Sequence, residues 1–125
     1  MKPVLVDSDI LIEVSRGRDD QIAERWLALS ESTEGVLCSP VTVAEVWCGA
    51  KPREHAFLES LFASMFCVPI GDEIGRRAGD YLASYRKSHN LELGDALIAA
   101  TASSCRALLW TRNKRHYPMR DVDFY

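Results

Sequence analysis

Hydrophobic positions along this chain form short continuous runs that alternate with longer segments of helical spacing. Short continuous apolar runs are typical of strands buried on both faces of a parallel sheet. They predict strands at residues 2–6, 36–39, 67–70, 107–110 and 122–125. Apolar residues three and four positions apart predict helices at about residues 8–16, 20–30, 40–49, 54–66, 72–88 and 95–105. This alternation predicts an α/β fold with a short, mainly parallel sheet of four to five strands, covered on both faces.

Residues that favour helix ends support these boundaries. Ser8 can cap the first helix and Gly17 can end it. Ser39 followed by Pro40 is a favourable start for the third helix, with serine as the cap and proline at the first helical position. A chain of 125 residues has the length of one domain, so we expect a single domain over residues 1–125.

Composition and charge give partial information on whether the protein binds nucleic acid, lies in a reducing compartment or crosses a membrane. The net charge of −3 argues against binding nucleic acid by bulk electrostatics, although residues 112–116 form a local basic segment. Three of the four scattered cysteines (Cys38, Cys48, Cys67 and Cys105) lie in apolar surroundings, which predicts buried thiols in a reducing compartment. No apolar run approaches the roughly 20 residues needed to cross a bilayer, and no signal peptide is apparent. We therefore expect a cytoplasmic protein that does not contact a membrane.

Three apolar segments contain carboxylates as their only charged side chains. These acids are Asp7 with Asp9 in residues 3–12, Glu45 in residues 41–50, and Asp95 in residues 93–100. An unpaired carboxylate is costly in apolar surroundings and is usually paired or bound to a cation. In open parallel sheets the carboxyl ends of the strands meet at one edge, where ligands bind. The pattern therefore predicts a shared acidic site for a hard divalent metal, whose preferred ligands are oxygens.

Each acid also has a plainer structural interpretation. Asp7 could be a turn or cap residue after a strand, although Ser8 can already cap the helix. Glu45 fits a capping box with Thr42, although the helix has an earlier start. Asp95 could equally be the N-cap of its own helix, and its residues alone leave that question open.

Three further polar residues have uncertain roles at the sequence level. Asp9 could point back toward the acidic site or only complement the dipole of the first helix. Asn113 could be a turn residue, a ligand through water or a phosphate contact. His116 is more typical of a surface residue than of a metal ligand, because no second histidine lies at ligand spacing.

Four segments of the chain resemble the motifs of the PIN domain family. They are residues 4–12 (VLVDSDILI), 39–46 (SPVTVAEV), 93–102 (LGDALIAATA) and 109–117 (LWTRNKRHY). Their order and spacing match over essentially the whole chain. A PIN domain of this length with nothing appended is similar to the VapC toxins of prokaryotic type II toxin–antitoxin systems.

The resemblance implies a three-layer α/β/α fold and an endoribonuclease that depends on Mg²⁺ or Mn²⁺. It also implies a homodimer, and inhibition by a small antitoxin whose C-terminal segment enters the active-site groove. Asp7 and Asp95 would be metal ligands, as would Glu45, either directly or through water. Many relatives have a fourth acid where this chain offers Asn113 or His116, so the number of metals is left open.

The chemistry that we expect is attack of a metal-activated water on an RNA phosphodiester. Other residues would support the acids or contact the RNA, and these are Ser8, Asp9, Thr111, Asn113, Arg115 and His116. Arg112 and Lys114 are weaker candidates for phosphate contacts. Neither the base sequence that is cut nor the antitoxin follows from these residues.

Two alternatives come from other functional classes. Asp7-Ser8-Asp9 could be the D-x-D motif of a haloacid-dehalogenase-type phosphatase with Asp7 as nucleophile, although that motif usually continues with Gly-Thr or Gly-Ser. Alternatively, the chain could be a non-catalytic PIN-fold module that binds partners or a second copy. Its contact surface would be an apolar helix face formed by Phe57, Leu61 and Met65.

Overall fold

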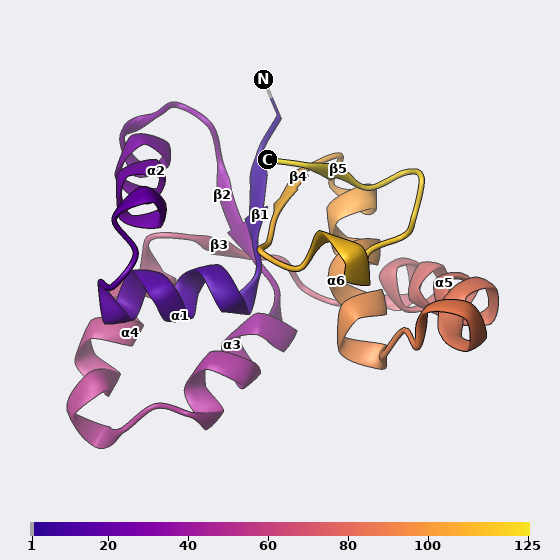
Figure 1. Ribbon diagram of the computed structural model, residues 1–125, viewed down its shortest axis with the longest axis horizontal. Coiled ribbons are helices and arrows are strands. Elements are labelled where there is room, and N and C mark those ends of the chain that lie inside the picture. Colours follow the sequence, from indigo (N-terminus) through magenta and orange to yellow (C-terminus); the bar gives the residue numbers. More distant parts are fainter. Residues whose placement is uncertain (1) are drawn as a thin grey trace.

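The computed structural model describes residues 2–125, and in that range it contains five short strands and six α-helices (Figure 1). The strands are β1 (Val4–Val6), β2 (Val36–Cys38), β3 (Phe66–Cys67), β4 (Leu108–Trp110) and β5 (Asp123–Phe124). The helices are α1 (Ser8–Arg16), α2 (Asp20–Glu31), α3 (Pro40–Cys48), α4 (His55–Ala63), α5 (Asp72–His89) and α6 (Leu93–Ser104). Two short 3-10 turns are η1 (Pro52–Glu54) and η2 (Lys114–His116).

The five strands form one sheet in the order β3-β2-β1-β4-β5, and every neighbouring pair is parallel. The chain starts in the central strand β1, builds outward to β3, and then returns to β4 and β5 on the other side. The strand order therefore reverses between β1 and β4. In open α/β sheets the crevice at such a reversal, beyond the carboxyl ends of the strands, is where ligands bind. The expected parallel sheet is confirmed.

Alternate residues of the central strands bury opposite faces of the sheet. Val4 and Val6 pack into a core with α1 to α4, whereas Leu5 packs into a second core with α5 and α6. In β4, Leu109 belongs to the second core and Trp110 to the first. Figure 1 shows the sheet edge-on between these two helical layers. The three-layer α/β/α arrangement implied by the resemblance is confirmed.

Several element boundaries differ from the predicted ones. Helix α6 begins at Leu93 rather than Asp95, because Glu92 is the extended residue that precedes the helix. The predicted helix at 54–66 is shorter, since the N–H of Ser64 donates to carbonyls of the last turn and closes α4 at Ala63. The chain then enters β3 at Phe66, earlier than predicted.

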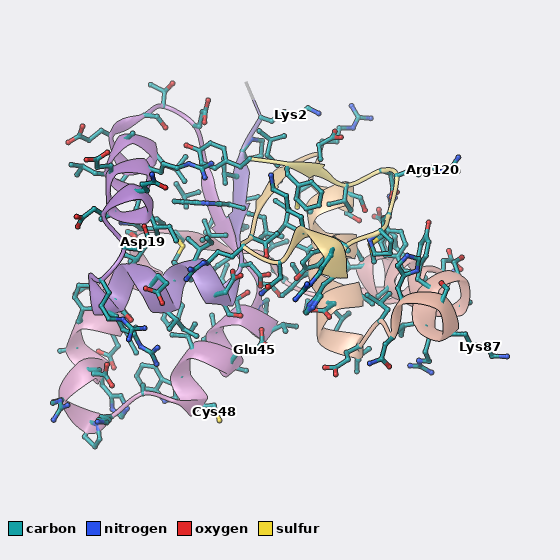
Figure 2. All side chains as sticks on the ribbon, viewed as in Figure 1. Lys2, Asp19, Glu45, Cys48, Lys87 and Arg120 are labelled. Atoms are coloured by element: carbon teal, nitrogen blue, oxygen red, sulfur yellow. The ribbon has the colours of Figure 1, made fainter. Side chains whose placement is uncertain are left out.

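The cysteine prediction is wrong for two residues. Cys38 is buried in β2 and Cys105 is half-buried, but Cys48 and Cys67 are exposed. Cys67 lies in β3, at the edge of the sheet, and Cys48 ends α3 at the molecular surface (Figure 2). An apolar sequence neighbourhood thus failed to predict burial at an edge strand and at a helix end.

The apolar face predicted on the fourth helix is also mostly covered. Leu61 and Met65 are buried in the core formed with α1 to α3, and only Phe57 remains exposed, with 51% of its surface accessible. These side chains stabilise the fold itself. They do not form a continuous exposed surface for a partner.

Candidate active site

Asp7 is the residue that directly follows β1 at the carboxyl edge of the sheet. Its N–H donates to the carbonyl of Trp110 (2.9 Å), which extends the pairing of β1 with β4 to this position. One carboxylate oxygen, Oδ1, accepts from the N–H of Ser8 (2.8 Å) and caps α1. The other, Oδ2, accepts from the hydroxyls of Thr111 and Tyr117, each at 2.9 Å. Asp7 is therefore both the helix cap and a side chain whose two oxygens are fixed by donors.

Asp9 binds the loop that follows β4. Its Oδ2 accepts from the N–H of Arg112 (2.9 Å), the amide Nδ2 of Asn113 (3.1 Å) and the hydroxyl of Thr111 (3.4 Å). Thr111 thus lies between the two aspartates, and its Oγ1 also accepts from the N–H of Asn113 (3.1 Å). The other oxygen of Asp9, Oδ1, is buried and accepts no hydrogen bond from the protein.

A cleft of about 500 Å³ opens at this edge of the sheet. Its lining includes five carboxylates from three segments of the chain, namely Asp7, Asp9, Glu45, Glu92 and Asp95. Glu45 reaches the cleft from α3 (Figure 2), and Asp95 from the first turn of α6. The cleft is also lined by polar side chains without a negative charge, and within residues 2–125 no lysine or arginine lines it. These polar residues are Ser8, His89, Asn90, Asn113, His116 and Tyr117. So many like charges in one cleft favour a bound cation.

The pKa values of three of these acids are raised. Loss of hydration is the main cause for the half-buried Asp9 and Asp95, and also for Glu45, which loses only part of its hydration because much of its side chain is exposed. The charge of Asp7 raises the pKa of each further. For Glu45, the Ser8 hydroxyl acts in the opposite direction, and for Asp95 the nearby His116 does. The folded protein therefore holds these carboxylates close together at an electrostatic cost.

Tyr117 is a buried phenol at the centre of the acidic cluster. Its hydroxyl lies 2.9 Å from Oδ2 of Asp7 and 3.5 Å from Oδ1 of Asp95. Burial and then the charges of Asp7 and Asp95 raise its pKa far above the ordinary value of 10.0, so the hydroxyl keeps its proton. Tyr117 therefore acts as a hydrogen-bond donor between two acids that come from opposite sides of the cleft.

The donor set of the cleft fits a hard divalent cation. Within residues 2–125, no group of three or more His, Cys, Asp or Glu side chains is arranged so that it could hold a metal ion. Mg²⁺ does not need such a group, because it retains several waters and binds through one or two carboxylates plus substrate phosphate. A cation at this position would give the buried Oδ1 of Asp9 a partner. It would also reduce the repulsion among the carboxylates of the cleft.

Comparison with known proteins identifies the family of the chain. A family model described as the PIN domain matches residues 4–124, which is nearly the full length. The chain belongs to the PIN domain family. This membership removes the haloacid-dehalogenase alternative, because the PIN domain match includes the D-x-D segment of Asp7 and Asp9.

Two relatives of this PIN domain are named ribonucleases. It is 42% identical to Ribonuclease VapC10 of Mycobacterium tuberculosis over 118 residues, which cover 93% of this chain and 86% of that protein. Ribonuclease VapC19 of the same organism is 33% identical over 116 residues, 92% of each chain.

Solved structures share the fold over nearly the whole chain. A toxin–antitoxin complex from Klebsiella pneumoniae superposes with a TM-score of 0.74 at 26% identity, covering 95% of this chain and 94% of that one. DNA-bound VapBC from Salmonella typhimurium superposes with a TM-score of 0.83 at 20% identity, covering 100% and 98%. In the described part of this PIN domain, no helix combines the length and hydrophobicity needed to cross a membrane.

The PIN domain places the sequence-predicted acids in one cleft, with three differences in detail. Asp7 itself caps α1, so capping and site functions coexist where Ser8 was expected to be the cap. Glu45 lies mid-helix as expected, but its side chain is exposed to solvent and not enclosed by apolar neighbours. Asp95 is in the first turn of α6 and is not its N-cap, since Glu92 holds that position.

The basic segment after β4 is only partly directed at the cleft. Asn113 and His116 line it, whereas Arg115 does not. Arg112 pairs with Glu13 (3.4 Å), and Lys114 lies over the ring of Phe124 (5.5 Å), so both have partners elsewhere. The expected phosphate contacts of these three basic residues therefore stay predictions, to be tested with RNA bound.

Sequence reasoning gave no role to several residues of the cleft. Tyr117 stood at the end of the fourth motif, but its contact with Asp7 spans 110 positions and depends on the pairing of β1 with β4. His89, Asn90 and Glu92 come from the connection between α5 and α6, which has no motif of its own. The only available signal for Glu92 was an acid directly before the motif at residues 93–102.

We expect Asp9→Ala to loosen the loop after β4. The substitution removes the acceptor of the Arg112 N–H and the Asn113 amide, and hydrogen bonds to a charged group contribute about 1.5–3 kcal/mol each. Hydrogen exchange should show that protection of the Arg112 amide falls about tenfold or more. Asp9→Asn keeps an acceptor oxygen and is the matched control. Equal protection in wild type and Asp9→Ala would show that the loop is held by other contacts.

Proposed function

We propose that this PIN domain, a single domain over residues 1–125, is a divalent-metal-dependent endoribonuclease. The observation that supports it most strongly is the convergence of five carboxylates from three segments at the reversal of strand order. A cleft of that charge has no ordinary structural purpose, because it raises the pKa values of its own acids. The activity matches the printed names of relatives that are 42% and 33% identical over most of the chain.

Asp7 and Asp95 are the proposed direct ligands of Mg²⁺ or Mn²⁺, with Glu45 as a ligand directly or through water. When bound, the cation would polarise a phosphoryl oxygen and lower the pKa of the attacking water. Asp7 suits this role because donors hold both its oxygens in one orientation. Asp9 and Thr111 fix the loop whose Asn113 and His116 face the substrate space. The Ser8 hydroxyl lowers the pKa of Glu45 and so favours its ionised form.

The same charges make RNA binding depend on the cation. A phosphodiester carries one negative charge per nucleotide, and five ionised carboxylates in the cleft would repel it. Neutralising part of that charge lets the scissile phosphate approach the acids. Arg115 lies outside the lining and is proposed to contact the RNA backbone away from the scissile phosphate.

In the cell, we propose that the chain is the toxin of a VapBC-type pair located in the cytoplasm. Its partners would be RNA, a small cognate antitoxin and a second copy of the chain. Support comes from the VapC relatives and from the fold shared with a toxin–antitoxin complex at 26% identity.

Metal removal tests the reaction directly. Cleavage of a fluorophore- and quencher-labelled RNA should require Mg²⁺ or Mn²⁺ and should fall at least about a hundredfold in EDTA, because water activation and charge neutralisation are both lost. Excess Mn²⁺ should restore the rate. It should also raise the unfolding midpoint, since a ligand at 100 times its Kd stabilises by about 2.7 kcal/mol. RNA cleavage that persists undiminished in EDTA would contradict the proposed chemistry.

A further inference from the structure

The hydroxyl of Tyr117 is shared by two acids of the cleft that lie far apart in the sequence, whereas the hydroxyl of Thr111 is shared by the neighbouring acids Asp7 and Asp9. The Tyr117 hydroxyl lies 2.9 Å from Oδ2 of Asp7 and 3.5 Å from Oδ1 of Asp95. These acids come from elements on either side of the sheet reversal, the end of β1 and the first turn of α6. A single O–H group therefore lies within hydrogen-bonding distance of both carboxylates.

The position of this hydroxyl is set by packing. Tyr117 is only 4% exposed and belongs to the core that includes Leu109 and the α6 residue Ala96. Its N–H donates to the carbonyl of Lys114 (3.0 Å), which closes η2 and fixes where the ring enters the core. The ring has little freedom, so its hydroxyl remains beside the acids.

We propose that Tyr117 is a positioning residue for metal binding, which fixes the orientation of Asp7 and its separation from Asp95. This inference rests on the proposed metal-dependent function. Tyr117 is not itself a ligand in this proposal, because a protonated phenol is a poor one. It acts through Asp7, whose Oδ2 it shares with the hydroxyl of Thr111.

Two physical effects support the role. A ligating carboxylate that is held by hydrogen bonds loses less rotational freedom on binding a cation, and such outer contacts commonly change metal affinity by about 10- to 100-fold. In addition, the O–H dipole between two like charges reduces their repulsion before the cation arrives.

The test is Tyr117→Phe, which keeps the ring and removes only the donor. Binding of Mn²⁺ alone should be measured by calorimetry in the absence of RNA, and cleavage should be measured separately. We expect the Kd for Mn²⁺ to rise about tenfold. At a fixed subsaturating Mn²⁺ concentration kcat should fall by a similar factor. When Mn²⁺ is raised to saturation, kcat and KM for RNA should both return to within about twofold of the wild-type values, because the substitution acts through metal affinity.

Tyr81→Phe is the matched control. Tyr81 is 8% exposed, and its hydroxyl donates to a carboxylate of Asp121 at 2.8 Å, outside the acidic cleft. It therefore reproduces the loss of a buried phenol–carboxylate bond without touching the site. Its Mn²⁺ affinity and kcat should match those of the wild type, even if the unfolding midpoints of both variants fall.

The outcomes separate this inference from the proposed function. Wild-type protein that binds Mn²⁺ and cleaves RNA, with Tyr117→Phe indistinguishable in Mn²⁺ affinity, would overturn the role of Tyr117 alone. An equal loss of affinity in both variants would assign the effect to general destabilisation and would also overturn it. Wild-type protein that binds no Mn²⁺ would overturn the proposed function and the role of Tyr117 together.

Discussion

Asp7→Asn should reduce RNA cleavage at least about a thousandfold while the fold stays intact. The variant loses the negative charge at the point where three segments of the site converge, and loss of a charge that holds the catalytic cation costs about 4 kcal/mol or more of transition-state stabilisation. Asparagine remains a good helix cap, so its side-chain oxygen can still accept from the Ser8 N–H that Asp7 now binds. Mn²⁺ binding, measured by calorimetry, should weaken in parallel with the rate.

Asp19→Asn is the control for the structural part of this effect. Asp19 caps α2 through a hydrogen bond from the N–H of Ile22 (3.1 Å), and it does not line the cleft. Both variants should keep the circular dichroism spectrum and an unfolding midpoint close to that of the wild type. Only Asp7→Asn should lose activity. Full cleavage by purified Asp7→Asn would mean that Asp7 is a helix cap and nothing more.

The position of the site could be predicted from the sequence because the geometry of a parallel sheet determines where the strand ends meet. An acid directly after a buried strand must lie at the carboxyl edge, and this places Asp7 regardless of side-chain detail. Glu45 and Asp95 follow from helix starts that proline and the helix dipole determine. What these rules do not give is the exposure of each side chain. Glu45 is mid-helix as predicted, yet its neighbours leave it open to solvent.

Contacts between distant segments were the part that sequence reasoning missed. The hydroxyl of Tyr117 reaches Asp7 only because β1 and β4 pair in a register that aligns Val6 with Trp110. An aromatic residue in a loop has no local pattern that distinguishes a core side chain from a donor to an active-site acid. Similarly, the sequence around Asp9 indicates a contact with the helix dipole equally well, and only the folded loop after β4 supplies the three hydrogen bonds that its carboxylate accepts.

Asp95→Asn should have opposite effects on activity and on the stability of the metal-free protein. Cleavage should fall at least about a hundredfold, because one proposed ligand is lost. The metal-free protein should nevertheless unfold about 2–5 °C higher, a change equivalent to roughly 1 kcal/mol or less for a domain of this size. The reason is that burial and the charges of Asp7 and Glu92 make the ionised form of Asp95 unfavourable, although His116 and Tyr117 offset part of the cost. Added Mn²⁺ should reverse the order of stability, since only the wild type gains fully from binding.

The pH dependence of the stability difference between metal-free Asp95→Asn and the wild type identifies its cause. The pKa of Asp95 is raised in the folded protein above its ordinary value of 3.8, so in the pH window between the two values the folded state binds more protons than the unfolded state. Stability is then lost as pH rises through that window. The stability of the wild type should therefore approach that of Asp95→Asn at about pH 4 and fall below it at neutral pH.

Asp20→Asn is the control for the loss of a helix-start charge. Asp20 lies in the first turn of α2 and outside the cleft, so it has no carboxylate neighbours in the cluster. The variant should show no such gain. If Asp95→Asn is more stable than the wild type by the same amount at both pH values, the cause is helix propensity or packing. Carboxylate repulsion would then not be the reason that the site is unstable without a cation.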